Sequence, residues 1–155
     1  MSWLLGIDLG EKRIGLATAE VEGGGAMPFR TIRRGRRIED DVAQLARVIA
    51  ELRIVEIVVG LPLEAAGNEG TQAQLTRTWV EAIQPLLGLP LAMRDERLSS
   101  HLAEQRLGPM KRGRSGGPPT PAQREAYRAR VDSEAAAIIL QDELDSRRER
   151  PKPAD

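Results

Sequence analysis

Near the amino terminus the chain carries the apolar run Trp3-Leu4-Leu5-Gly6-Ile7-Asp8-Leu9. Consecutive apolar residues over this length predict a central strand. Asp8 is the exception, because burying a lone carboxylate in such a strand costs on the order of several kcal/mol unless something neutralises it. Two partners remain open at this point. One is Lys12 or Arg13 across a tight turn, and the other is a metal ion shared with further carboxylates.

The strands and helices that follow indicate an α/β fold. Residues 14–21 and 27–33 predict two more strands, so the first third of the chain is expected to form an antiparallel meander. Helices and strands then alternate, over residues 38–52, 54–61, 71–87 and 89–93. Because this order implies parallel crossovers, we expect a mixed five-stranded sheet flanked by helices.

The last third of the chain predicts two helices around a flexible loop. A short helix is expected after Leu98, and residues 108–120 are rich in glycine and proline. Thr120-Pro121-Ala122-Gln123 is typical of a capping box with proline at the first helical position, so a long helix should run from there to about Asp145. We expect one domain over residues 1–146 and a disordered tail over residues 147–155.

Composition narrows the chemistry that is available. The 155 residues include no cysteine and one histidine, His101, and the net charge is +0. Thiolate sites are therefore excluded, and any metal would be a hard cation such as Mg²⁺ or Mn²⁺ held by oxygen ligands. No basic leader precedes the first apolar run and no apolar stretch approaches the length of a membrane span, so we expect a cytoplasmic protein without membrane contact.

Three acidic positions stand out because they lie at or beside apolar elements. They are Asp8 in the first strand, the pair Asp95-Glu96 after the strand at 89–93, and Asp132 on the apolar side of the last helix. If the fold brings them together, mutual repulsion requires a cation among them. Each also has an ordinary interpretation, since Asp95 could cap the next helix and Asp132 could be an exposed helical acid.

Five blocks in this order resemble the YqgF (RuvX) family. They are Gly6-Ile7-Asp8-Leu9-Gly10, Arg13-Ile14-Gly15-Leu16-Ala17, Val58-Val59-Gly60-Leu61-Pro62-Leu63, Asp95-Glu96-Arg97-Leu98-Ser99-Ser100 and Val131-Asp132-Ser133-Glu134-Ala135-Ala136. Each block is a weak signal, but five in sequence across nearly the whole chain are specific.

The resemblance implies an RNase H-like fold related to the RuvC Holliday junction resolvases, and a cytoplasmic bacterial nuclease that processes pre-16S ribosomal RNA. It further implies that Asp8, Glu96 and Asp132 are catalytic ligands of one or two Mg²⁺ or Mn²⁺ ions, with Asp95 as an alternative to Glu96. Two such ions would activate an attacking water and stabilise the leaving oxygen.

Basic residues of the predicted loop are candidates for substrate binding. Glycines around Lys111, Arg112 and Arg114 would let these side chains adapt to a phosphate backbone, and Arg97 could bind phosphate or pair with an acid. We therefore expect a nucleic-acid partner, either an RNA precursor or branched DNA, with a homodimer as a further possibility. Two alternatives stay open: a noncatalytic factor that binds RNA or the ribosome, and an ATPase of the actin/hexokinase class.

Overall fold

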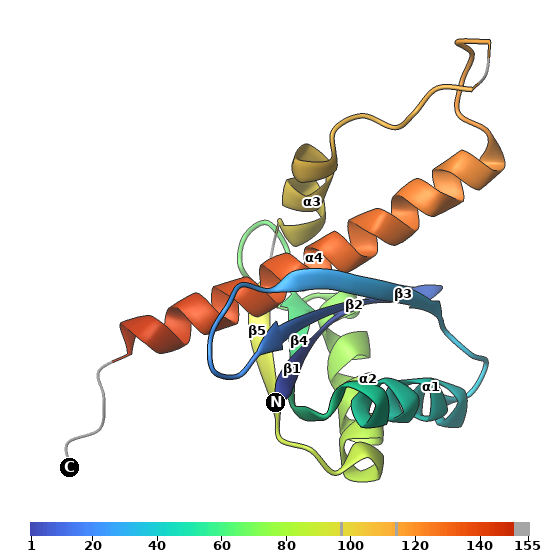
Figure 1. Ribbon diagram of the computed structural model, residues 1–155. Coiled ribbons are helices and arrows are strands. Elements are labelled where there is room, and N and C mark those ends of the chain that lie inside the picture. The colour runs from blue at the N-terminus through green and yellow to red at the C-terminus, as the bar shows by residue number, and fades with distance from the viewer. Residues whose placement is uncertain (97, 114, 151–155) are drawn as a thin grey trace.

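A five-stranded sheet with helices on both faces forms the centre of the molecule (Figure 1). The computed structural model describes residues 1–96, 98–113 and 115–150. The strand order is β3-β2-β1-β4-β5. The elements are β1 (Trp3–Leu9), β2 (Arg13–Glu20), β3 (Met27–Arg33), α1 (Ile38–Leu52), β4 (Ile54–Pro62), α2 (Thr71–Leu87), β5 (Leu91–Glu96), α3 (Ser99–Leu107) and α4 (Pro121–Glu149).

The first three strands form the expected antiparallel meander. β1 and β2 pair so that Asp8 faces Gly15, and the tight turn between them is closed by the Gly10 amide, which donates to the Arg13 carbonyl at 2.8 Å. β3 extends the sheet beyond β2. This hairpin fixes the register of Asp8 against its neighbours.

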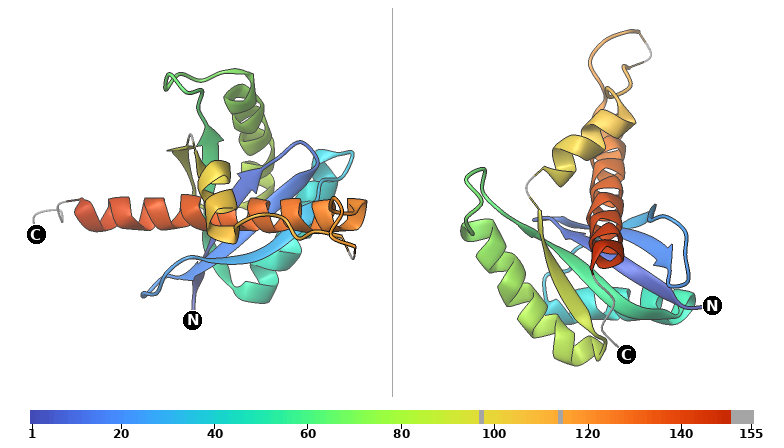
Figure 2. Two further views of the ribbon diagram at one scale, coloured as in Figure 1. Left: turned by 90° about the horizontal axis from the view of Figure 1, so that it is seen from above. Right: turned by 90° about the vertical axis from the view of Figure 1, so that its left-hand side faces the viewer.

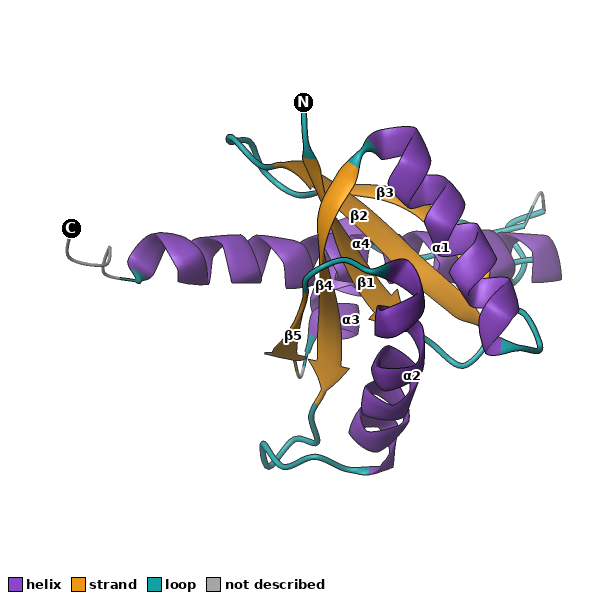
Figure 3. Ribbon diagram, turned by 90° about the horizontal axis from the view of Figure 1, so that it is seen from below, coloured by secondary structure: helices purple, strands orange, loops and turns teal. Residues whose placement is uncertain are grey.

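The second half of the sheet is parallel. β4 pairs with β1, and β5 pairs with β4, while α1 and α2 make the two crossovers. Both helices cover one face of the sheet, and α4 crosses the other face (Figure 3). The larger hydrophobic core lies between the sheet and α1 and α2, and includes Leu5, Ile7, Ile57, Leu45 and Trp79. Among the described residues, no helix has both the length and the hydropathy for crossing a bilayer.

Glycines on three adjacent strands let α4 lie directly on the sheet. A Cβ at Gly15 would stand 2.1 Å from the carbonyl oxygen of Asp132, and one at Gly60 would stand 2.4 Å from Ile139. Gly6, on the strand between them, faces the backbone of Ala136 in the same way, at 2.9 Å. A side chain at these positions would push the helix outward, so the glycines set how closely its acids approach the strands.

Two elements, β5 and α4, differ from the sequence-based expectation by more than one residue. The fifth strand is Leu91–Glu96 rather than 89–93, because its pairing with β4 continues to Pro62 opposite Glu96. Helix α4 continues to Glu149 rather than ending near Asp145 and projects past the sheet at both ends (Figure 2). Its last turns are held by Arg147, whose guanidinium donates to both carboxylate oxygens of Glu56 at 2.6 and 2.8 Å. Residues 151–155 of the expected tail lie outside the described residues.

Candidate active site

Asp8 lies one residue before the end of β1, on the face that α4 covers. Side chains alternate along a strand, so Asp8 shares this face with Gly6, which touches α4. Its partner on β2 is Gly15, against which the backbone of Asp132 packs. The carboxyl of Asp8 therefore stands where the end of a central strand meets the long helix.

Glu96 lies at the end of β5, two strands away on the same edge of the sheet. Both acids line a cavity of about 300 Å³, together with Gly60 and Pro62 of the intervening strand. The remaining walls come from residues 98–101, at the start of α3, and from Ile139 of α4. The carboxyl ends of parallel strands are the usual place for ligand sites in such sheets.

The structure separates Glu96 from Asp95. The residue that lines the cavity with Asp8 is Glu96, whereas Asp95 is exposed and lines a different hollow beside α4. The strand was predicted to end before these residues, but β5 includes both of them. Because successive side chains of a strand point to opposite faces of the sheet, Asp95 and Glu96 face different sides. The sequence alone left this choice open.

Both carboxyl groups of the cavity resist ionisation. Burial, followed by the charge of Asp132, raises the pKa of Asp8 from 3.8 to about 7. Burial also raises the pKa of Glu96 to about 7, helped by a hydrogen bond with Asp142 and opposed by Arg94. Buried acids with raised pKa values that face one cavity are typical of functional sites and of cation sites.

Asp132 approaches Asp8 but its side chain turns to a different partner. Its Oδ2 accepts a hydrogen bond from Arg13 Nε at 2.7 Å, and the same guanidinium lies 3.4 Å from Glu125. Arg13 is thus the partner of Asp132, and the interpretation that Asp8 pairs with Lys12 or Arg13 is wrong. In the described part of the chain, no hydrogen bond or ion pair reaches the Asp8 carboxyl.

Sequence reasoning missed a polar cluster behind Glu96. Asp142 contacts it, and Arg94 Nε lies 3.6 Å from Glu96 Oε1 while Arg94 Nη1 lies 3.6 Å from the buried Glu143. Arg94 Nε is buried and, among the described residues, has no hydrogen-bond partner. One signal was available, since Asp142 and Glu143 follow the apolar residue Ile139 by three and four positions and so share its helix face.

The acids fit a divalent cation in their chemistry. They offer hard oxygen ligands, and among the described residues the partly buried Asp8 has no ion-pair partner. Over residues 1–96, 98–113 and 115–150, no three His, Cys, Asp or Glu side chains are grouped closely enough to hold a metal ion. At this site Asp132 is hydrogen-bonded to Arg13 and is not among the described residues that line the cavity of Asp8 and Glu96.

The predicted substrate-binding residues are only partly described. Lys111 and Arg112 are exposed on the segment that joins α3 to α4. Arg112 Nη1 donates to the Gly116 carbonyl at 3.4 Å, which closes a small loop. Arg97 and Arg114 lie outside the described residues.

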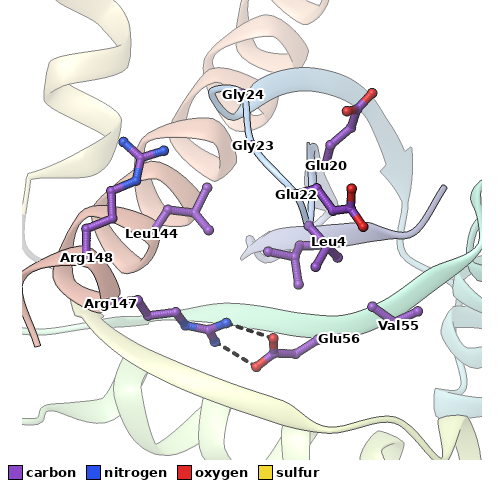
Figure 4. Close-up of a pocket in the computed structure, with 11 residues that line it drawn as sticks. Leu4, Glu20, Glu22, Gly23, Gly24, Val55, Glu56, Leu144, Arg147 and Arg148 are labelled. Atoms are coloured by element: carbon purple, nitrogen blue, oxygen red, sulfur yellow. Dashed lines mark hydrogen bonds and ion pairs between the residues drawn. The ribbon is translucent and has the colours of Figure 1, made fainter. Parts of the chain in front are cut away.

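A separate hollow of about 400 Å³ lies at the opposite end of the sheet from Asp8 (Figure 4). Leu4 and Val55 contribute from the beginnings of β1 and β4, and the ion pair of Glu56 with Arg147 spans one side. None of the described residues that line this hollow also lines the cavity of Asp8 and Glu96, so the two are distinct.

Comparison with known proteins identifies the family. Residues 2–146 match the model of the RuvX family, described as Holliday junction resolvase. The chain belongs to the RuvX (YqgF) family. A RuvX relative from Chloroflexus aggregans, named "Putative pre-16S rRNA nuclease", is 41% identical over 94% of each chain. A protein of the same name from Anaeromyxobacter sp. strain Fw109-5 is 43% identical, over 92% of this chain and 96% of that one.

Solved structures agree on the fold. Thermus thermophilus RuvC, in complex with a Holliday junction substrate, superposes with a TM-score of 0.51 over 96% of this chain and 97% of that one, at 16% sequence identity. The mixed sheet of this RuvX chain is accordingly RNase H-like, as expected from the sequence. Family membership and the named relatives support a nuclease or Holliday junction resolvase role.

Proposed function

We propose that this RuvX chain is a two-metal-ion nuclease that hydrolyses phosphodiester bonds in an RNA precursor or in branched DNA, with the cavity of Asp8 and Glu96 as its active site. One observation carries the proposal: two partly buried carboxyls, each with its pKa raised to about 7, face one cavity at the carboxyl edge of the sheet. A dominant ion pair would lower these pKa values instead, and the contact of Arg94 with Glu96 is outweighed by burial.

Asp8, Glu96 and Asp132 are the residues that would hold Mg²⁺ or Mn²⁺. When bound, the cations supply the positive charge that activates water and stabilises the leaving oxygen. Asp8 would give up its proton as the cation arrives, because metal ligands must be deprotonated. Asp132 would exchange Arg13 for the cation, and Arg13 would then be available to a phosphate oxygen of the substrate.

The chain's own residues supply the rest of the reaction site. Asp142 and Arg94 contact Glu96 from behind and hold its carboxyl toward the cavity. Ser99, Ser100 and His101, at the amino-terminal end of α3, border the cavity on the open side. Lys111 and Arg112 would bind the phosphate backbone at a distance from the cut. Symmetric cutting of a four-way junction would need two copies of the chain.

A second candidate is favoured by the Arg13–Asp132 contact. If that contact is permanent, the third acid stays neutralised, and the chain is a noncatalytic factor that binds RNA or the ribosome. Metal binding separates the two functions, because a permanent contact leaves too few carboxylates for a tight divalent site.

The test is cleavage of labelled pre-ribosomal RNA, single-stranded DNA and a four-way junction in Mn²⁺. The wild type is expected to cut at least one substrate, while Asp8→Asn and Glu96→Gln lose on the order of 10²-fold or more in rate. Glu104→Gln, an exposed acid on α3, is the matched control and should cut normally. Cleavage retained by Asp8→Asn would remove Asp8 from the mechanism, and RNA binding without any cutting would favour the noncatalytic factor.

A further inference from the structure

A second cavity lies at the carboxyl-terminal end of α3, which is the end away from the active site. It has a volume of about 370 Å³ and lies between the end of α3, the segment that follows it and the first turns of α4. Figure 1 shows this segment arching from α3 to the start of α4. Six of the residues that line the cavity matter here: Leu107, Met110, Lys111, Gln123, Tyr127 and Arg130.

Hydrogen bonds hold the walls of this cavity in place. The Tyr127 hydroxyl donates to the Gly108 carbonyl at 2.8 Å, and Gln123 Nε2 donates to the Arg112 carbonyl at 3.1 Å. Gln123 also accepts from the Thr120 amide through its side chain, as part of the capping box of α4. The segment after α3 is therefore hydrogen-bonded to α4 at two points, and these bonds fix the walls of the cavity.

The charged side chains described in the lining of this cavity are all positive. Lys111 and Arg130 contribute two cations, and none of the described residues that line the cavity is acidic. Within the described residues, neither side chain takes part in an ion pair, whereas Arg13 and Arg106 on the flanks are both paired with carboxylates. An anion is the ligand that such a pair of free cations favours.

The remaining lining is apolar and includes an aromatic ring. Leu107, Met110 and Tyr127 are each partly buried and line the cavity beside the two cations. An apolar and aromatic wall next to positive charge matches a nucleotide, whose base stacks and whose phosphate is anionic. A base held in a duplex is not free to enter, so the occupant must be unpaired.

Helix α3 sets the distance between this cavity and the active site. His101 lines the cavity of Asp8 and Glu96, and Leu107 lines the second one. Six residues of α-helix correspond to about 9 Å along the axis. A stacked strand advances about 3.4 Å per nucleotide, so the two cavities are roughly two to three nucleotides apart.

We propose that this second cavity receives one unpaired nucleotide of the substrate strand, two to three nucleotides from the bond that is cut. Lys111 and Arg130 bind its phosphate, and the base lies against Met110 and Tyr127. The inference rests on the proposed nuclease function and adds a preference for substrates that are single-stranded beside the cut.

The phosphate contact is tested by binding, without catalysis, in an Asp8→Asn background. Fluorescence anisotropy with a labelled single-stranded RNA, and with DNA of the same sequence, is measured from 50 to 200 mM salt. Loss of one phosphate contact should make the negative slope of log affinity against log salt less steep by about 0.7. This corresponds to about a fourfold loss of affinity at 0.15 M salt. We expect this for Arg130→Ala, and about a fifteenfold loss for Lys111→Ala combined with Arg130→Ala.

Arg128→Ala is the matched control, because it removes the same charge from the same helix about 200° around the axis. It should leave the slope unchanged, and circular dichroism verifies that each variant is folded. Equal losses for Arg130→Ala and Arg128→Ala would overturn the inference, since they would indicate only general charge attraction.

The base contact is tested with abasic nucleotides placed one at a time in a substrate whose cut has been mapped with the unaltered protein. Loss of stacking should weaken binding by about tenfold at one position, two to three nucleotides from the cut. An equal effect at every position overturns the base contact. If Arg130→Ala and Arg128→Ala differ as expected but the unaltered protein never cuts, the nuclease proposal fails and the phosphate site stands.

Discussion

Replacing Asp8 by asparagine should stabilise the metal-free protein at neutral and alkaline pH. The buried carboxyl of Asp8 has its pKa raised from 3.8 to about 7, so above pH 7 the folded state must carry a charge that burial and Asp132 oppose. Asparagine has nearly the same shape and does not ionise. The cost of the buried charge is therefore absent in the variant.

The size of the effect follows from the two pKa values. Between pH 3.8 and 7 the unfolded chain releases this proton and the folded chain keeps it, so stability falls by about 1.36 kcal/mol per pH unit. Above pH 7 the loss is complete, at about 4 kcal/mol. At pH 5 only about 1.6 kcal/mol has been lost, and below pH 3.8 the contribution disappears.

Urea unfolding in EDTA, followed by circular dichroism, measures the difference. Asp8→Asn should exceed the wild type by about 2–4 kcal/mol at pH 8, allowing for relaxation of the site, and by less than half of that at pH 5. Glu104→Gln, which removes an exposed acid, should stay within about 0.5 kcal/mol at both pH values. An Asp8→Asn protein no more stable than the wild type at pH 8, or one whose gain does not shrink on acidification, would show that the Asp8 carboxylate does not destabilise the folded state.

Three further outcomes are expected. Gly15→Ala should destabilise the fold by about 2 kcal/mol or more in urea unfolding and weaken cleavage, because its Cβ would stand 2.1 Å from the Asp132 carbonyl. Thr120→Ala should cost about 1 kcal/mol, since the side chain accepts a hydrogen bond from the Gln123 amide; Thr120→Ser should restore it. Mn²⁺ at 100 times its dissociation constant should stabilise the wild type by about 2.7 kcal/mol in thermal unfolding at pH 8, but not Asp8→Asn, and EDTA should reverse the effect.

Local patterns in the sequence predicted most of the elements. Helix α1 at Ile38–Leu52 and helix α2 at Thr71–Leu87 match the predicted ranges, because the spacing of their apolar residues is a local pattern. The capping box at Thr120 was predicted for the same reason. The end of β5 was not predicted, because its pairing with Pro62 depends on a strand more than 30 residues earlier in the sequence.

The order of the strands and helices, the family, and the candidate acids Asp8, Asp95-Glu96 and Asp132 could be predicted from the amino-acid sequence, whereas the buried Glu143 could not. The three-dimensional structure was needed to show that Glu96 rather than Asp95 shares a cavity with Asp8, and that Arg13 binds Asp132, 119 residues away. Glu96 reaches the cavity because β5 pairs with β4 as far as Pro62, whereas the contact of Arg13 with Asp132 depends on the short distance between α4 and the sheet. That distance is set jointly by glycines on three strands, and no local pattern encodes it.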